Sequence, residues 1–155
     1  MAQEVRYSDQ KCQESLACRT LLNAKPDYVI EGEIVEVTDA DTIVLKLFVL
    51  PGLEYTIPVR SRGVNAPEIF RPGCETERAL GIKARASVQE KFSPGRPVRL
   101  SDIGRDKYGG RIVGTIERWD SDRMKSLSEE LLESDQAVVD IEGSGSHNWC
   151  GGVAN

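Results

Sequence analysis

Hydrophobic and polar residues follow a clear pattern from residue 28 onwards. Residues 28–38 alternate with a period close to two, which is typical of a strand with one buried face. Residues 42–49 form a second run rich in β-branched side chains, and residues 55–64 alternate again. Turn-forming residues at positions 39–41 and 51–52 separate the three runs. The pattern therefore predicts three strands joined by short turns.

A period of four residues follows these strands and indicates an amphipathic helix. The apolar residues that repeat are Leu80, Ala84, Val88 and Phe92. Proline and glycine at positions 94 and 95 end the helix. We therefore expect the four repeating side chains to form its buried face.

Two further strands and a second helix complete the predicted order. Residues 98–103 and 111–116 have the pattern of strands, with the polar segment 104–110 between them. Ser126 and Glu129 have the spacing of a capping box, so a helix is expected from there through Glu133. This order is that of an OB fold. The predicted class is α+β: a five-stranded OB barrel with a helix between strands three and four and one or two C-terminal helices.

Length and composition indicate one domain with short extensions. The chain has 155 residues, of which 39% are hydrophobic and 29% charged, as in an ordinary globular protein. We expect an N-terminal extension with about one helical turn in residues 1–27, the OB domain in residues 28–142, and a tail in residues 143–155 anchored by Trp149 and Cys150. No apolar run approaches the roughly 20 residues of a membrane span, so no membrane association is expected, and we expect a monomer.

The net charge of −5 limits the kinds of partner that the chain can bind. A protein that clamps long duplex DNA usually has a basic face, because phosphate neutralisation supplies most of its affinity. The acidic balance argues against such a binder. It leaves room for an enzyme that holds one or two phosphates in a locally basic pocket.

Four cysteines occur at positions 12, 18, 74 and 150. In an oxidising compartment they allow two disulfides with three connectivities, and in the cytosol they would be four reduced thiols. A zinc site from Cys12, Cys18, His147 and Cys150 is a further alternative. We favour disulfides over zinc, since Cys12 and Cys18 are farther apart than the usual pair of zinc ligands.

Three polar segments lie where predicted strands meet turns, which is where functional sites tend to occur. In the first, Asp39 and Asp41 suit a hard cation that binds several oxygens, although Asp-rich turns are common for local reasons. In the second, Arg60 is followed by Asn65 and Glu68. Arginine binds phosphate oxygens, and a nearby carboxylate can take a proton from water. The alternative is a surface cluster of ion pairs.

The third segment contains Lys107, Tyr108 and Arg111, with two glycines before the arginine. Such a segment can wrap a phosphate, or it can be a charged hairpin loop with ordinary turn glycines. Each segment alone is a weak indication, and the three have to be considered together.

Their order closely resembles the staphylococcal nuclease family. The motifs are Asp-x-Asp-Thr at 39–42, Arg60 followed by Asn-Ala-Pro-Glu at 65–68, and Asp-Lys-Tyr-Gly-Gly-Arg at 106–111. The resemblance covers residues 31–116 and continues more loosely to 149–150. It implies a Ca²⁺ site in which Asp41, Asn65 and the backbone carbonyl of Ala66 are ligands, with Asp39 directly behind them.

The resemblance also implies roles for the other residues. Glu68 would orient or deprotonate the attacking water, and Arg60 and Arg111 would hold the phosphate, the latter through a one-residue bulge. Lys107 and Tyr108 would contact a terminal phosphate. The implied activity is calcium-dependent cleavage of DNA and RNA that leaves 3′-phosphates, with a single-stranded nucleic acid as substrate.

Two departures from the family pattern leave an alternative open. Asn65 stands where the family usually has an aspartate, and residues 137–142 lack the family's tyrosine and basic residues. The alternative is a weakly active or inactive homologue that acts as an OB-type module binding a single-stranded nucleic acid or a protein.

The relatives that the chain most resembles are secreted bacterial proteins that often carry cysteines at both positions 74 and 150. The resemblance therefore implies a Cys74–Cys150 disulfide, which would leave Cys12 to pair with Cys18. It favours a periplasmic or secreted location, with the cytoplasm as the alternative. The N-terminus has no apolar signal-peptide core, so a secreted form would already have lost its signal peptide.

Overall fold

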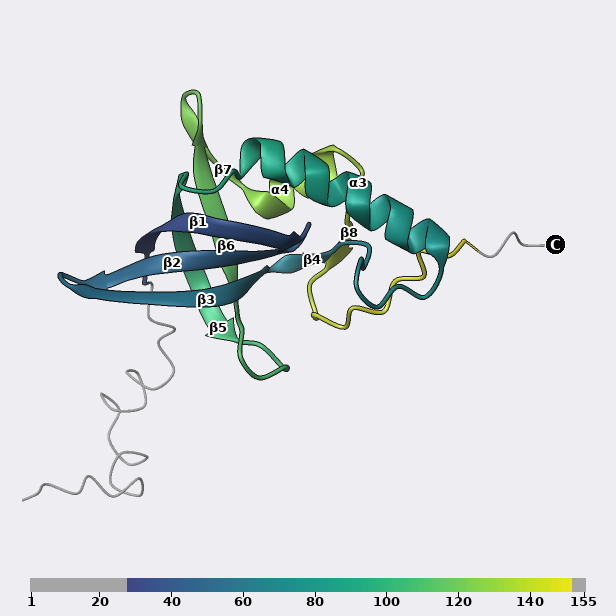
Figure 1. Cartoon of the computed structure of the whole chain (residues 1–155), viewed down its shortest axis with the longest axis horizontal. Coiled ribbons are helices and arrows are strands. Elements are labelled where there is room, and N and C mark those ends of the chain that lie inside the picture. The colour runs from purple at the N-terminus through teal and green to yellow at the C-terminus, as the bar shows by residue number, and fades with distance from the viewer. Residues whose placement is uncertain (1–27, 152–155) are drawn as a thin grey trace, which may run out of the picture.

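A computed structural model describes residues 28–151, which form two helices and eight strands (Figure 1). The strands are β1 (Ile30–Asp39), β2 (Thr42–Leu50), β3 (Leu53–Ser61), β4 (Gly63–Asn65), β5 (Pro97–Arg105), β6 (Ile112–Asp120), β7 (Arg123–Ser126) and β8 (Val138–Asp140). The helices are α3 (Glu75–Lys91) and α4 (Leu127–Glu133). The predicted N-terminal extension and the Cys12–Cys18 pair lie outside the described residues.

Six strands form one sheet in the order β3-β2-β1-β5-β6-β7, with antiparallel neighbours. A short parallel pairing joins Val59–Ser61 of β3 to Ile112–Gly114 of β6 and partly closes the sheet into a ring. β4 and β8 form a separate antiparallel pair. The predicted α+β class is confirmed in this form, a sheet with a barrel-like curl and two helices.

The core lies between the inner face of this sheet and the two helices. The sheet and both helices supply its buried side chains. They are Ile34, Ile43, Leu45, Val59, Leu100 and Ile116 of the sheet, Ala84, Val88 and Phe92 at α3, and Leu127 and Leu131 of α4. Alternate residues along each strand supply the buried side chains, as the sequence pattern indicated. Figure 1 shows both helices on the same side of the sheet.

The buried face of α3 differs from the predicted one. Leu80 is 41% exposed, so its assignment to the buried face is wrong. The neighbouring Gly81 is buried instead, because the helix backbone there packs directly against the chain at residues 67–69. A side chain at position 81 would collide with that backbone, which a hydrophobic period cannot reveal.

The predicted third strand, residues 55–64, is interrupted at Arg62. β3 ends at Ser61, and Gly63 then adopts a φ of +81°, a conformation that favours glycine. The chain turns there into β4, which pairs with β8 over Gly63–Asn65 and Val138–Asp140. Three residues are too few to show a period, so neither this pair nor the short β7 was predicted.

The capping box at the start of α4 is confirmed. The Ser126 hydroxyl accepts the Glu129 N–H at 3.1 Å, and the Glu129 carboxylate accepts the Ser126 N–H at 2.9 Å. These bonds satisfy two N–H groups that the helix itself leaves unpaired. α4 therefore begins at the expected residue.

A buried ion-pair network ties α4 to the rest of the fold. The Glu130 carboxylate, whose side chain is 7% exposed, lies 3.3 Å from Arg118 of β6 and 3.2 Å from Lys125 of β7, and also pairs with Lys91 of α3. Burial alone would raise the pKa of Glu130, but hydrogen bonds from Lys91 and Lys125 outweigh burial and hold it below its usual value.

Replacing Glu130 by glutamine should lower the free energy of unfolding by about 3 kcal/mol at pH 7, because it removes the buried carboxylate that pairs with Lys91, Arg118 and Lys125. The control is Glu133→Gln, whose side chain is 57% exposed, and it should change the stability by less than about 1 kcal/mol. The pKa of Glu130 is lower in the folded state, so its contribution is present above the unfolded pKa near 4.5 and is lost as the pH falls through the folded pKa. Urea unfolding of both variants at pH 7 and pH 3 measures this. An equal loss at both pH values would contradict it.

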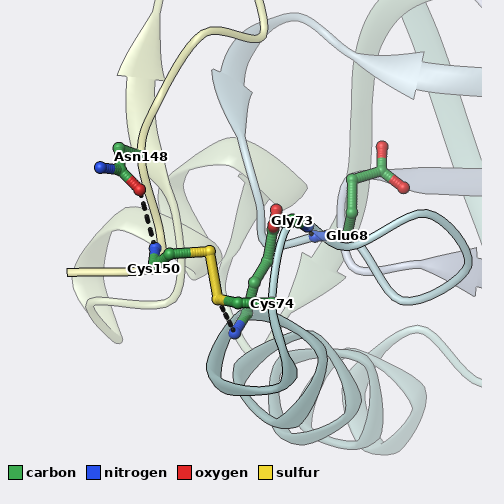
Figure 2. Close-up of a disulfide and its surroundings, with 6 residues drawn as sticks. Glu68, Gly73, Cys74, Asn148 and Cys150 are labelled. Carbon is green, nitrogen blue, oxygen red and sulfur yellow. Dashed lines mark hydrogen bonds between the residues drawn. A yellow bond between two sulfur atoms is a disulfide. The ribbon is translucent and has the colours of Figure 1, made fainter. Parts of the chain in front are cut away.

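A disulfide joins Cys74 to Cys150, which confirms the predicted pair (Figure 2). The Cα atoms are 5.9 Å apart, and the bond connects positions separated by 76 residues. It excludes the zinc alternative, since Cys150 is no longer a free ligand. The bond is compatible with a non-cytoplasmic location.

Within residues 28–151, no helix combines the length and the apolar character needed to cross a membrane.

The double variant Cys74→Ser/Cys150→Ser should lose about 2–5 kcal/mol of unfolding free energy, since closing a long loop restricts the unfolded chain. Cys74 is also the N-cap of α3, and its sulfur accepts the Glu77 N–H at 3.4 Å. Serine offers an oxygen for the same bond, so the variant tests the bridge rather than the cap. Chemical denaturation of the variant and of reduced wild type should give matching curves. A variant as stable as the oxidised wild type would contradict the prediction.

Candidate active-site cleft

A cleft with a volume of about 110 Å³ brings the second and third polar segments together, and Asp41 of the first lies 3.5 Å from its lining residue Arg60. Six of the predicted site residues line it: Arg60, Asn65, Glu68, Lys107, Tyr108 and Arg111. Glu77 of α3 and Ser144, Gly145 and Trp149 of the C-terminal segment complete the lining. The cleft thus joins residues from four separate parts of the chain.

Strand pairing explains why these segments meet. Arg60 is opposite Thr42 of β2, and its neighbour Ser61 donates its N–H to the Asp41 carbonyl at 2.7 Å. On the other side, Arg60 is opposite Val113 of β6. The loop at 106–111 leads into β6, so this parallel pairing carries the basic loop to the end of β3. The turn at Gly63 then returns the chain through Asn65 to the same place.

Arg60 lies at the centre of the site and is held by several acceptors. Its guanidinium group is 3.5 Å from the Asp41 carboxylate and donates to the Asn65 side-chain oxygen at 3.2 Å. The Asp140 carboxylate lies 3.9 Å away on the other side. The Arg60 side chain is only 13% exposed, so its position is fixed before any ligand binds.

Carboxylates accumulate beside Arg60. The pKa of Asp39 is raised to about 6, first by burial and then by the nearby negative charges of Glu68 and Asp41. The pKa of Glu68 is also raised, first by partial burial and then by the charge of Asp41. One oxygen of Asp39 is buried and finds no hydrogen-bond partner among residues 28–151. A carboxylate oxygen of this kind is a possible ligand for a cation.

The predicted ligands provide oxygens of the type that Ca²⁺ binds. The buried Asp41 carboxylate accepts the Ala66 N–H at 2.9 Å and the Thr42 hydroxyl at 3.0 Å, which fixes Asp41 beside the Ala66 backbone. Within residues 28–151, no three histidine, cysteine, aspartate or glutamate side chains converge as a metal cluster. The predicted ligands are the Asp41 carboxylate, the Asn65 amide oxygen and the Ala66 carbonyl, and Asp39 is expected behind them. With the unpaired Asp39 oxygen, this set fits a divalent cation.

The basic loop bonds to other parts of the chain itself. Lys107 donates to the backbone carbonyls of Gly143 at 2.9 Å and Ser144 at 3.2 Å. Arg111 pairs with the Asp106 carboxylate. The Lys107 ammonium and the Arg111 guanidinium also lie 5.2 and 5.1 Å from the centre of the exposed Tyr108 ring, close enough for cation–π attraction. The two cations and the aromatic ring therefore form one surface.

The extra glycine before Arg111 has a structural role. Gly110 has a φ of +86°, which turns the loop immediately before β6. Arg111 consequently lies in the cleft, with a side chain that is 24% exposed, although Asp106 holds it there. The prediction that Arg111 belongs to the candidate site agrees with this placement.

The C-terminal segment is held to the fold by more contacts than the sequence indicated. The tail was expected to be anchored by Trp149 and Cys150, yet the Asp140 carboxylate also binds the N–H groups of Ser144 and Gly145, each at 2.9 Å. Burial alone would raise the pKa of Asp140, but these bonds outweigh it and lower the pKa. An aspartate three residues before a Gly-Ser-Gly-Ser run was the available signal for such a turn.

Glu77 and Trp149 were also missed as residues of the cleft. Trp149 was interpreted as an apolar anchor, but it lines the cleft and stacks edge-on against His147, with ring centres 4.3 Å apart. Glu77 is 9% exposed, and both of its carboxylate oxygens bind backbone N–H groups. An acidic residue in the first turn of a helix is common, so no sequence signal distinguished Glu77.

Neither a family model nor a curated protein matches this chain. What the cleft can do must therefore be derived from its own residues. They supply a fixed guanidinium at Arg60, a second guanidinium paired with Asp106, the Lys107 ammonium with exposed contacts, the exposed Glu68 carboxylate, and oxygens of the kind that bind a cation. This set of groups matches the needs of phosphate-ester chemistry.

Restoring a carboxylate at position 65 should strengthen calcium binding. Asn65→Asp adds a negative charge beside Asp41 and should lower the Kd for Ca²⁺ roughly tenfold, because affinity follows the charge of the ligands. Asn148→Asp is the control, since it adds the same charge in the exposed tail. Isothermal titration calorimetry measures both. Equal affinities for Asn65→Asp and Asn148→Asp would mean that residue 65 is not a ligand.

Proposed function

We propose that this protein is a calcium-dependent nuclease of the staphylococcal nuclease type, with an OB barrel, that hydrolyses phosphodiester bonds of DNA and RNA and leaves 3′-phosphates. One observation carries the proposal: Arg60, Glu68, Lys107, Tyr108 and Arg111 come from distant segments and line the same cleft. A surface cluster of ion pairs would not require a shared cleft beside a group of buried carboxylates.

Arg60 is suited to stabilise charge on the phosphate. Its position is fixed by Asp41 and Asn65, so little reorganisation is needed when the phosphate oxygens gain negative charge in the transition state. Arg111 supplies a second guanidinium in the cleft lining, once the phosphate replaces Asp106 as its partner. Bound Ca²⁺ would supply further charge neutralisation next to Asp41, Asn65 and the Ala66 carbonyl.

Glu68 is suited to take the proton from water. Its carboxylate is exposed to the cleft, and its raised pKa makes it a better base than an ordinary glutamate. As the proton moves to Glu68, the water oxygen bonds to phosphorus and the bond from phosphorus to the 5′ oxygen breaks. The 5′ oxygen is then protonated from solvent, and the phosphate stays on the 3′ side.

The second cavity beside the cleft favours a polymeric substrate. It has a volume of about 240 Å³, shares Arg60 and Lys107 with the cleft, and includes Arg62 and Arg105 in its lining. A nucleotide next to the reacting phosphate would have room there. The exposed Tyr108 ring offers a surface on which a base can stack in a single strand. We therefore propose single-stranded nucleic acid as the substrate of a monomeric enzyme.

We also propose a periplasmic or secreted location. The Cys74–Cys150 disulfide supports it, because such bonds persist in oxidising compartments and are rare in the cytoplasm.

One feature favours the alternative of a weakly active or inactive binding module. Each cation of the cleft already has acceptors within the protein: Asp41 and Asp140 for Arg60, Asp106 for Arg111, and tail carbonyls for Lys107. A phosphate must displace some of these partners, and the net charge of −5 does not attract polyanions. This combination predicts weak substrate binding whether or not hydrolysis follows.

The decisive assay is hydrolysis of single-stranded DNA and RNA with Ca²⁺ and with a chelator, followed by end-group analysis. We expect cleavage with Ca²⁺ alone and 3′-phosphate ends. Glu68→Gln and Arg60→Ala should each reduce the rate at least about a hundredfold. Glu90→Gln and Arg78→Ala are the matched controls, because they change exposed residues of α3 in the same way.

Two results would contradict the nuclease proposal. Activity of both Glu68→Gln and Arg60→Ala within threefold of their controls would remove these residues from the site. Wild-type protein that binds a fluorescent oligonucleotide without cleaving it, and loses that binding in Lys107→Ala, would support the binding module.

A further inference from the structure

Glu77 contacts the segment that carries Glu68. One oxygen of its carboxylate accepts the Glu68 N–H at 3.1 Å, and the other accepts the Gly73 N–H at 2.7 Å. Glu77 thus spans the two ends of the loop between Glu68 and α3. Figure 2 shows Gly73 next to Cys74 of the disulfide, and Glu68 on the side of Gly73 away from it. A side chain that is buried and bonded at both oxygens has a single position.

The helix backbone contacts the same segment one turn later. An added Cβ at Gly81 would lie 2.7 Å from the Pro67 carbonyl oxygen, 2.9 Å from the Ile69 side chain and 3.2 Å from the Glu68 carbonyl oxygen. These separations are shorter than van der Waals contact, so only glycine allows α3 to lie this close. Glu68 is therefore held through its N–H by Glu77 and flanked on its carbonyl side by Gly81.

A carboxylate is the side chain that this arrangement requires. Two backbone N–H groups point at Glu77, and a carboxylate offers an acceptor oxygen to each. A glutamine in the same place has one acceptor oxygen, so its NH₂ group would face the second N–H. Bonds from N–H groups to a charged acceptor are also stronger than those to a neutral one.

We infer that Glu77 is a positioning residue for Glu68: by binding the N–H groups of Glu68 and Gly73, it sets where the Glu68 carboxylate enters the cleft. The inference rests on the nuclease proposed above. Glu77 itself does not act as the base, because both of its oxygens are engaged. It acts on the geometry of the reaction, where a displacement of about 1 Å can cost roughly a hundredfold in rate.

The test compares Glu77→Gln with Glu75→Gln. Both variants remove one negative charge from the first turn of α3, so their effect on the helix dipole is the same, but Glu75 is exposed. We expect kcat of Glu77→Gln to fall roughly ten- to a hundredfold against Glu75→Gln, with KM for single-stranded DNA changed less than about threefold. A general loss of structure would instead change both constants. Equal kcat values for the two variants would overturn the inference.

A second readout does not depend on activity. Hydrogen exchange of the Glu68 and Gly73 amides, followed by NMR, should be at least about tenfold faster in Glu77→Gln than in Glu75→Gln, while amides in β1 and β2 stay protected. Unchanged exchange at both amides would overturn the inference even if no hydrolysis is found in any variant. Wild-type protein without hydrolysis but with the faster exchange in Glu77→Gln would reject the nuclease and keep the positioning role of Glu77.

If Glu77→Gln does not fold, Glu77→Asp replaces it in both measurements. It keeps the charge and both acceptor oxygens but withdraws the carboxylate by one methylene group. The same decrease in kcat and the same faster exchange are expected, and wild-type values for both would overturn the inference.

Discussion

The parallel contact between β3 and β6 is the constraint on which the cleft depends. It spans Val59–Ser61 and Ile112–Gly114, and it joins the edge strand β3 to β6, which partly closes an otherwise open antiparallel sheet. Arg60 occupies the middle of this contact, with β2 on its other side. Because backbone hydrogen bonds fix strand register, the side chain at position 60 cannot shift without breaking the ring closure. The basic loop before β6 and the acidic turn before β2 take their places from the same register.

Electrostatics in the cleft work against the stability of the free protein. Burial, and after it repulsion among Asp39, Asp41 and Glu68, raises the pKa values of Asp39 and Glu68, and one Asp39 oxygen is buried without a partner within residues 28–151. A buried polar atom without a partner costs free energy that the fold must supply elsewhere. Arrangements of this kind are concentrated at functional sites, because binding a ligand relieves them. The Glu130 carboxylate, in contrast, pairs with three cations, those of Lys91, Arg118 and Lys125, and its pKa is lowered rather than raised.

The sequence was sufficient for features that depend on local chemistry. Period-two alternation located the main strands, and the spacing of Ser126 and Glu129 located the start of α4. The site residues could be chosen because three motifs occur in a particular order, and the cleft lined by Arg60, Glu68 and Lys107 is consistent with that choice. Features that depend on close approach between distant segments were missed. Leu80 fits a helical period as well as Gly81 does, and only the packing of α3 on residues 67–69 decides between them.

The C-terminal segment buries little apolar surface and depends on the Cys74–Cys150 disulfide to stay in place. Residues 141–148 are exposed, and the bonds that hold this segment to the fold, from Lys107 and to Asp140, are largely solvent-exposed as well. Each such bond contributes about 0.5–1.5 kcal/mol, whereas ordering each backbone residue costs about 1–2 kcal/mol. Hydrogen bonds alone therefore would not keep Ser144, Gly145 and Trp149 against the cleft. The Cys74–Cys150 bridge changes this balance, because it fixes the far end of the segment at the N-terminus of α3 and lowers the entropy that the bonds must offset. The same helix end holds the Glu68 loop through Glu77, so one short stretch at the start of α3 holds both this loop and the C-terminal segment beside the cleft.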